Sequence, residues 1–226
     1  MKAIVGVARW LISVLFLLRR RMGVRHRTCF FSRQASRLTP DFALLQQQLR
    51  EADPTMDIVT ICCRYRGRQD GLLRFLRQCV RSVFLAASAQ VCVLDGYWPT
   101  ICLLRDKRDL RVIQIWHSVG KIKKSGYQTL DKPSGRSGAM ARALCMHRNY
   151  DAIIAGGPAW NPFYCAAFDV TEDRLRNWGL PRLDHLVSAK GETALCRRRF
   201  PELAGRTVVL LLPGTCCHWK SNFGHV

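Results

Sequence analysis

Short apolar runs alternate with segments of helical periodicity along most of the chain. The runs are almost continuously apolar, which predicts strands covered on both faces. They lie at 28–32, 56–63, 90–95, 111–117 and 151–157. Apolar residues at helical spacing predict helices at 41–52, with Thr39 as a cap, and at 70–88 and 138–148. Repeated strand–helix units favour a doubly wound, Rossmann-like α/β fold with a parallel sheet.

The N-terminal pattern differs from that of the body. An apolar run from Ala3 to Leu18 contains Arg9 and is followed by "RRRMGVRHR". Spanning a bilayer takes about 20 apolar residues, so the run is short, and it has no small-residue cleavage site. Cations beside it suit anionic headgroups. We expect residues 1–25 to form a membrane-associating helix, on the surface or as a short anchor; a first helix packed on the core is the alternative.

The charge of the chain restricts its partners. The 226 residues carry a formal net charge of +20, which indicates an anionic partner: nucleic acid, a membrane surface or phosphate-rich substrates. Zinc-finger spacing is absent from the sequence, and aromatic residues are not interleaved with the basic clusters. We therefore expect no nucleic acid partner.

Cysteine usage bears on the compartment and on metals. The eleven cysteines lie mostly inside apolar runs, as in "IVTICC" and "VCVLD", and the sequence contains no C-x-x-C pair. Cysteine behaves as a small buried hydrophobe in such places. We expect reduced thiols in a cytosolic compartment and no metal site, because the adjacent Cys216 and Cys217 are poorly placed to chelate one ion.

One histidine ends a predicted strand. In "RVIQIWHSVGKIKKSGYQ" His117 closes an apolar run, and ligands of such sheets bind at the carboxyl ends of the strands. Ser118 and Gly120 form a turn that exposes backbone amides. The lysines that follow, Lys121, Lys123 and Lys124, attract phosphate. A neutral imidazole there suits a general base for a hydroxyl group. A structural histidine bonded to a loop carbonyl is the alternative.

Several separate motifs occur in order between Arg27 and Leu186. They are "CFFSRQASRLTPDFALLQQQL", "IQIWHSVGKIKKSGYQTLDKPSG", "NYDAIIAGG", "FYCAAFDVTEDRL" and "NWGLPRLDHL". Together they resemble the CDP-glycerol glycerophosphotransferase family of teichoic acid polymerases and primases. The resemblance implies a two-domain GT-B transferase, in which 26–205 is the acceptor-side Rossmann-like domain and 206–226 begins a truncated nucleotide-binding domain.

The resemblance also implies an activity. Such enzymes move glycerol phosphate from CDP-glycerol to a lipid-linked glycerol phosphate acceptor at the cytoplasmic face of the membrane, in cell wall teichoic acid biosynthesis. We expect these substrates and no cofactor. His117 takes the place of the family's proposed base. Arg182 in "GLPRLD" either binds phosphate or pairs with Asp184. Arg33 in "FSRQ" either contacts phosphate or forms a structural ion pair.

Two departures from the family pattern qualify these expectations. Ser118 stands where the family often has glycine. The chain reads "GTCCHWKSNFGHV" where a donor-site turn is expected. The alternative function is therefore a non-catalytic domain that binds membrane or anionic polymer. The sequence leaves open CDP-glycerol or CDP-ribitol as donor, and priming or polymerising.

Overall fold

The computed structural model describes residues 2–65, 71–118, 123–133, 135–188, 198–203 and 205–206. The chain divides into two compact units, Met1–Leu186 and Val187–Val226. The first unit holds the fold described below. The expected start of a second domain at 206–226 lies, apart from Arg206, outside the described residues, so the expected domain boundaries stay predictions.

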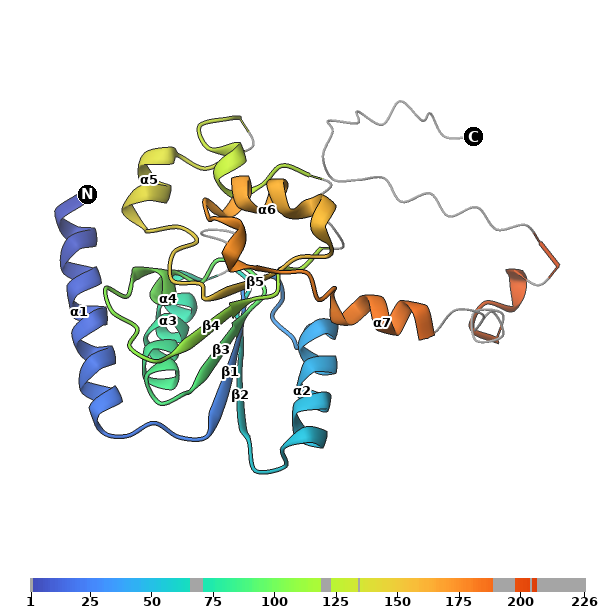
Figure 1. Ribbon diagram of the computed structural model, residues 1–226, viewed down its shortest axis with the longest axis horizontal. Coiled ribbons are helices and arrows are strands. Elements are labelled where there is room, and N and C mark those ends of the chain that lie inside the picture. The colour runs from blue at the N-terminus through green and yellow to red at the C-terminus, as the bar shows by residue number, and fades with distance from the viewer. Residues whose placement is uncertain are drawn as a thin grey trace. The chain divides into compact units, whose positions relative to one another are not determined.

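The first unit is built on one parallel sheet of six strands, in the order β2-β1-β3-β4-β5-β6 (Figure 1). The strands are β1 (Arg27–Ser32), β2 (Asp57–Cys62), β3 (Val91–Leu94), β4 (Arg111–Gln114), β5 (Ala152–Ile154) and β6 (Leu175–Arg176). The chain runs outward from β1 to β2 and then returns to the other side of β1 with β3. The predicted parallel α/β fold is confirmed.

Helices and short 3-10 turns connect the strands. The α-helices are α1 (Lys2–Arg21), α2 (Pro40–Ala52), α3 (Leu72–Ala87), α4 (Pro99–Leu103), α5 (Gly138–Ala143), α6 (Asn161–Phe168) and α7 (Pro181–Ser188). The 3-10 turns are η2 (Gly126–Thr129), η3 (Pro158–Trp160), η4 (Glu172–Arg174) and η5 (Pro201–Leu203). Thr39 is the N-cap of α2, as expected, although its side chain makes no capping hydrogen bond.

The sheet carries apolar side chains on both faces. Along β1, Cys29 and Phe31 belong to the larger core, together with buried residues of α1, α3 and α6. Phe30 points to the opposite face and packs on Phe42 of α2, with ring centroids 5.0 Å apart. Successive side chains of a strand point to opposite faces, so a strand covered on both sides needs a continuous apolar run. Figure 1 shows α2 on one side of the sheet and α3 and α4 on the other.

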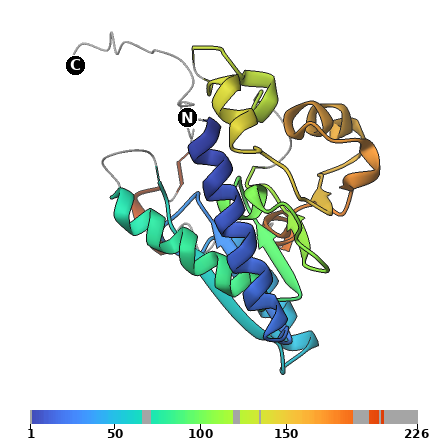
Figure 2. The ribbon, with the colours of Figure 1, turned by 90° about the vertical axis from the view of Figure 1, so that its left-hand side faces the viewer.

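Helix α1 packs beside α3 and α4 (Figure 2). Phe16 is fully buried, and the Arg20 guanidinium donates to the carbonyls of Ala87 and Ala89 and pairs with Asp109. The same helix exposes apolar side chains on its outer side, such as Leu11 at 48%. None of the described helices is both long enough and apolar enough to cross a bilayer. The expected membrane association of α1 stays a prediction.

Three predicted elements are clearly shorter in the structure, and one of them is the strand expected at 151–157, which spans only Ala152–Ile154. The strand expected at 111–117 ends at Gln114, and Trp116 takes a left-handed conformation with φ 63°. The helix expected at 138–148 ends at Ala143 and is followed by turns in which Cys145 and His147 have positive φ. The left-handed residues that follow Gln114 and Ala143 bend the chain where these two elements end.

Candidate active site

The carboxyl ends of four neighbouring strands meet at one edge of the sheet. The register pairs Phe31 of β1 with Ile61 of β2 and with Leu94 of β3, and Leu94 also pairs with Gln114 of β4. Residues that follow these positions therefore come together although they are far apart in sequence. The connection from β1 leads to β2 on one side, whereas β3 and the later strands lie on the other side of β1. The strand ends between β1 and β3 are therefore the topological switch point, where ligands of such folds bind.

A pocket of about 200 Å³ lies at this edge. We call it the strand-end pocket; it is lined by Arg33, Gln34, Arg64, Tyr65, Tyr97 and Arg136. Three of the lining side chains are arginines and none is acidic. Planar guanidinium groups match the oxygens of phosphate in a bidentate geometry. The pocket is therefore suited to a phosphate group or a phosphate ester.

The electrostatics of Arg33 also indicate an anionic ligand. Burial lowers the pKa of Arg33, and the nearby charge of Arg136 lowers it further. Both guanidinium groups lie over the ring of Tyr97, at 5.6 Å from its centroid. Arg33 donates to the Tyr97 carbonyl at 3.2 Å, but its Nε is buried without a hydrogen-bond partner in the described part of the chain. An anion in the pocket would relieve this repulsion and satisfy the buried donor.

Arg33 forms no ion pair within the described residues, so the alternative of a structural ion pair is not observed for it. An acidic side chain, Asp95, does follow β3 close by, and it is 1% exposed. Burial raises the pKa of Asp95 to about 6, although the Ser32 hydroxyl and the Arg33 backbone amide favour its charged form. Asp95 forms no ion pair with these arginines within the described residues.

Asp95 gives the stability of the fold a pH dependence. Its pKa is raised on folding, so the folded state binds the proton more tightly and the contribution of Asp95 to stability grows as pH falls from 7 to 4. Between pH 7 and pH 4 the free energy of unfolding should gain about 2–3 kcal/mol from protonation of Asp95, and we expect Asp95→Asn to lose this gain. Urea unfolding of both proteins at pH 4.5 and 7.5 measures it, with the exposed Asp184→Asn as control. A wild-type to Asp95→Asn difference that is the same at both pH values would contradict the assignment.

The imidazole of His117 follows the neighbouring strand β4 at this edge of the sheet and does not itself line the pocket. It is half-buried, and its Nδ1 donates a hydrogen bond to the backbone carbonyl of Asp95 at 2.8 Å. A carbonyl only accepts, so Nδ1 carries the proton and, in the neutral ring, Nε2 has the lone pair. The structural alternative also predicts a bond to a loop carbonyl. The same bond, however, sets the tautomer that a general base at Nε2 requires.

Gln114 and Trp116 fix the position of this histidine. Gln114 is fully buried; its amide nitrogen donates to the Gly96 carbonyl at 3.1 Å, and its oxygen accepts from the Trp116 amide at 3.0 Å. The left-handed backbone of Trp116 turns the chain back toward β3, at a cost of about 1–2 kcal/mol. The Trp116 and His117 rings are in contact, with centroids 4.1 Å apart. Gln114 thus links the ends of β3 and β4 and orients the imidazole.

Arg182, at the start of α7, forms an ion pair with Asp41 in the first turn of α2. Its Nε lies 3.0 and 2.9 Å from the two carboxylate oxygens, a terminal nitrogen also contacts one of them, and its backbone amide donates at 3.1 Å. Asp41 is 2% exposed. Of the alternatives for Arg182, an ion pair is observed, but with Asp41 rather than with Asp184. A role in phosphate binding stays a prediction.

The other expected site residues lie apart from the strand-end pocket or outside the described residues. Ser118 is exposed next to His117, and Lys123 and Lys124 are exposed and do not line the strand-end pocket. Gly120 and Lys121 fall outside the described residues. Among the described residues, the cations that line the strand-end pocket are arginines.

Sequence reasoning missed six residues of the site: Gln34, Arg64, Tyr65, Asp95, Tyr97 and Arg136. Asp95 had the same signal as His117, since it ends the apolar run "VCVLD". The two arginines had no local signal, because the pairing of β2 with β1 and the path of the loop before α5 bring them to this edge.

Within the described residues, no group of three or more histidine, cysteine or acidic side chains is arranged to hold a metal ion. The eight cysteines that the structure describes are free thiols, and four of those buried in the core have pKa values raised by burial: Cys29, Cys79, Cys92 and Cys102. Such thiols are packing residues rather than nucleophiles.

Comparison with protein families and curated proteins gives consistent matches. A family model described as CDP-Glycerol:Poly(glycerophosphate) glycerophosphotransferase matches residues 14–216. The teichoic acid ribitol-phosphate primase of Bacillus spizizenii is 26% identical over 219 residues, which are 94% of this chain and 54% of that protein. The teichoic acid glycerol-phosphate primase of Bacillus subtilis is 22% identical over 105 residues, 46% of this chain and 28% of that protein.

Solved structures give the same fold. The structure of the wall teichoic acid polymerase TagF superposes with a TM-score of 0.61 and 15% identity, covering 90% of this chain and 52% of that chain. The chain thus spans about half the length of the first of these curated relatives and of this polymerase structure.

Proposed function

The chain belongs to the CDP-glycerol:poly(glycerophosphate) glycerophosphotransferase family, and from this premise we propose that it is the acceptor-side, GT-B-type half of a transferase of teichoic acid biosynthesis. The proposed donor is CDP-glycerol and the proposed acceptor is a lipid-linked glycerol phosphate chain. The observation that carries the proposal is the Nδ1–H tautomer of His117 beside a pocket of three arginines.

The proposed chemistry assigns a separate task to each group. The arginines of the strand-end pocket bind the last phosphate of the acceptor and hold its terminal hydroxyl near His117. Nε2 accepts the hydroxyl proton while the oxygen forms a bond to the glycerol-bearing phosphorus of CDP-glycerol. The bond from that phosphorus to the bridging oxygen breaks, and CMP leaves with the bonding electrons. Phosphoryl transfer depends chiefly on positioning and charge stabilisation, which suits a pocket dominated by guanidinium groups.

Helices α1 and α3 support the proposed membrane location. They pack side by side, and neither contains an acidic residue. Both expose apolar side chains: Ile4, Val7, Trp10, Leu11, Leu15 and Leu18 on α1, and Leu72, Leu73, Leu76, Val80 and Phe84 on α3. Exposed arginines accompany them on α3, at positions 74, 77 and 81. Apolar side chains next to cations suit insertion into the surface of an anionic bilayer, where the lipid-linked acceptor would be found.

This membrane surface is tested with vesicles that contain phosphatidylglycerol. We expect Leu11→Glu with Leu76→Glu to weaken binding at least about tenfold, because each leucine loses ~1.5–3 kcal/mol of apolar burial. The matched control is Leu38→Glu with Leu186→Glu; these leucines are 48% and 59% exposed on other parts of the chain. Sedimentation with vesicles measures the affinity. Equal losses in the two double variants would contradict the surface.

The transferase activity is tested by CMP release. We expect a chimera of this chain with the rest of the ribitol-phosphate primase to release CMP when it is given a CDP-alditol donor and a lipid-linked glycerol phosphate acceptor. Assays with CDP-glycerol and with CDP-ribitol in parallel identify the donor. No release with either donor from a folded chimera would count against the assignment.

The second candidate function is a binding domain without turnover, which holds anionic polymer or membrane. It is favoured by the combination of a basic pocket with the apolar surface of α1 and α3. The two functions differ in the role of His117. A pure binding domain gives no CMP in any chimera and binds acceptor vesicles equally well with or without the imidazole.

A further inference from the structure

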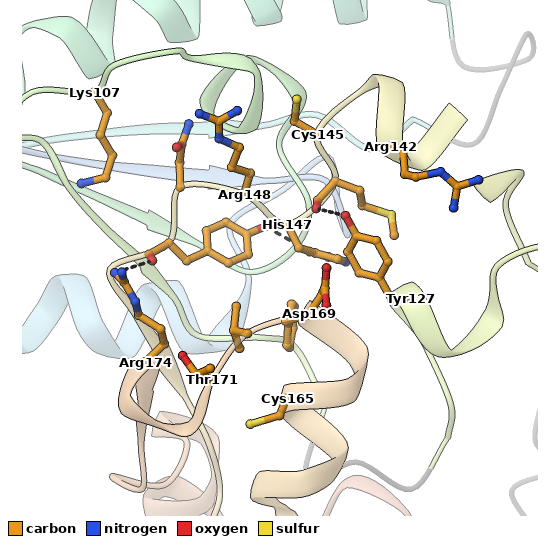
Figure 3. Close-up of a pocket in the computed structure, with 15 residues that line it drawn as sticks. Lys107, Tyr127, Arg142, Cys145, His147, Arg148, Cys165, Asp169, Thr171 and Arg174 are labelled. Carbon is orange, nitrogen blue, oxygen red and sulfur yellow. Dashed lines mark hydrogen bonds between the residues drawn. The ribbon is translucent and has the colours of Figure 1, made fainter. Parts of the chain in front are cut away.

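A second, larger cavity lies between α6 and the turns that follow α5. Its volume is about 830 Å³, and we call it the α6 pocket. Figure 3 shows that α6 and the segment after it supply Cys165, Asp169, Thr171 and Arg174, whereas the turns after α5 supply Arg148. Nothing in the site described above uses this cavity.

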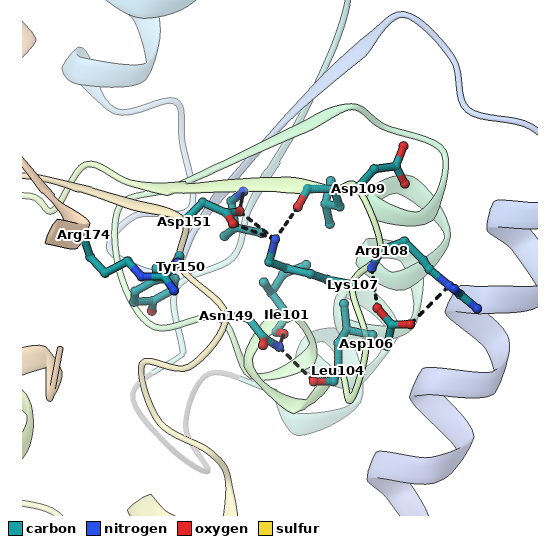
Figure 4. A network of polar contacts seen from close by, with 12 residues as sticks. Ile101, Leu104, Asp106, Lys107, Arg108, Asp109, Asn149, Tyr150, Asp151 and Arg174 are labelled. Carbon is teal, nitrogen blue, oxygen red and sulfur yellow. Dashed lines mark hydrogen bonds and ion pairs between the residues drawn. The ribbon is translucent and has the colours of Figure 1, made fainter. Parts of the chain in front are cut away.

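The α6 pocket is strongly basic. Four of its lining side chains are cations (Lys107, Arg142, Arg148 and Arg174), and Asp169 is the one acidic side chain among the lining residues. Lys107 is already neutralised, because its Nζ contacts both oxygens of Asp151 at 2.8 and 2.7 Å (Figure 4). Arg174 forms an exposed ion pair with Asp173 at 3.5 Å, whereas Arg142 and Arg148 form no ion pair in the part of the chain that the structure describes. The pocket therefore has uncompensated positive charge.

The wall of the α6 pocket is held rigidly. Cys145, His147 and Asn149 alternate along one turn segment with φ values of 50°, 62° and 74°, which non-glycine residues rarely adopt. Asn149 donates to the carbonyls of Ile101 and Leu104 at 2.8 and 2.9 Å. The His147 ring is buried and contacts Phe168 edge-on at 4.6 Å. Strained backbone that is fixed by its surroundings is often found at ligand sites.

Tyr97 connects the α6 pocket to the strand-end pocket. It lines the strand-end pocket beneath Arg33 and Arg136, and its ring lies 6.0 Å from the ring of His147, which lines the α6 pocket. Its hydroxyl donates to the Leu144 carbonyl in the turns after α5, at 3.0 Å. The buried Tyr97 thus links the wall of the strand-end pocket to the turn segment whose next residues line the α6 pocket.

We propose that the α6 pocket is a second binding site for a phosphorylated polyol, and that it holds an inner unit of the acceptor chain whose terminal unit occupies the strand-end pocket. This inference rests on the proposed function for the identity of the chain. Arg148 and Arg174 bind the phosphate, and Asp169 accepts hydrogen bonds from polyol hydroxyls. A polymer with one phosphate per unit matches two neighbouring basic pockets, whereas a single anion needs only one of them.

The proposal is tested by binding to the 226-residue chain in the absence of any donor. The probes are inorganic phosphate, sn-glycerol 3-phosphate and a synthetic trimer of glycerol phosphate. Calorimetry gives the affinities, and amide chemical shifts of Thr171 and Gln34 report on the α6 pocket and the strand-end pocket. We expect the trimer to shift both amides and to bind at least about tenfold more tightly than the monomer, because its second unit binds intramolecularly.

Variants separate this site from general electrostatic attraction. We expect Arg148→Gln with Arg174→Gln to lower trimer affinity about tenfold or more and to abolish the Thr171 shift only. The control Arg25→Gln with Arg50→Gln removes the same charge from exposed positions that line neither pocket, and we expect less than a twofold effect. Arg148→Gln alone, at an exposed position, repeats the test with the smallest risk to folding.

Three results would overturn the inference: equal losses in the two double variants, a trimer that shifts only Gln34, or inorganic phosphate that binds as tightly as glycerol phosphate. Failure of the proposed transferase function gives a different result. In that case the trimer still occupies the α6 pocket, while the chimera releases no CMP.

Discussion

The His117→Ala variant of the chimera is expected to release CMP about 10²–10⁴-fold more slowly than the unmodified chimera. The bond from Nδ1 to the Asp95 carbonyl places the lone pair of the neutral ring on Nε2, so the variant loses the group that takes the acceptor proton. The arginines of the strand-end pocket remain, so the KM for the acceptor should change by less than about threefold.

Two controls separate this catalytic role from a structural one. Ser118→Ala alters the exposed neighbour and should leave the rate within about twofold. Free imidazole should restore part of the rate of His117→Ala, because it can enter the space left by the ring. A variant that keeps the full rate, or one whose loss is confined to KM, would show that His117 is not the base.

The second large effect is expected on stability. Arg182→Ala leaves the carboxylate of Asp41 in its buried position without its guanidinium partner. Breaking a buried pair costs about 3–5 kcal/mol. Because the Arg182 side chain is 30% exposed, water compensates in part, and we expect a loss of about 2–3 kcal/mol in the free energy of unfolding. Urea denaturation measures it.

Asp184→Ala is the matched control for this prediction. Asp184 is the partner that the sequence suggested for Arg182, but it is exposed and does not form the pair. Its removal should change the free energy of unfolding by less than about 0.5 kcal/mol. Equal destabilisation by the two variants would contradict the Arg182–Asp41 pair.

Much of the fold could be predicted from the sequence, because strands covered on both faces need continuous apolar runs. β1, β2 and β3 agree with the runs to within one residue at each end. β6 was missed, since two residues give no periodicity. The strand through Trp116 was predicted too long, because the left-handed turn there depends on the buried Gln114 side chain and on β3, which no local pattern reveals.

The candidate site could be predicted only in part. His117 and Arg33 follow apolar strands, so their place at the strand ends could be inferred from the parallel sheet. The lysines after His117 were expected to supply the positive charge; of these, Lys123 and Lys124 do not line the pocket, and the arginines that do are Arg33, Arg64 and Arg136. Their positions depend on strand order and loop paths, which composition and spacing do not determine.

The central claim is that the terminal unit of an anionic acceptor binds among the strand-end arginines with a hydroxyl at His117. A crystal structure of the chain with sn-glycerol 3-phosphate tests it most directly. The account predicts the phosphate within hydrogen-bond distance of Arg33 and Arg136, and a glycerol hydroxyl about 2.6–3.2 Å from Nε2 of His117. A phosphate bound at neither arginine, or a glycerol directed away from the imidazole, would contradict it.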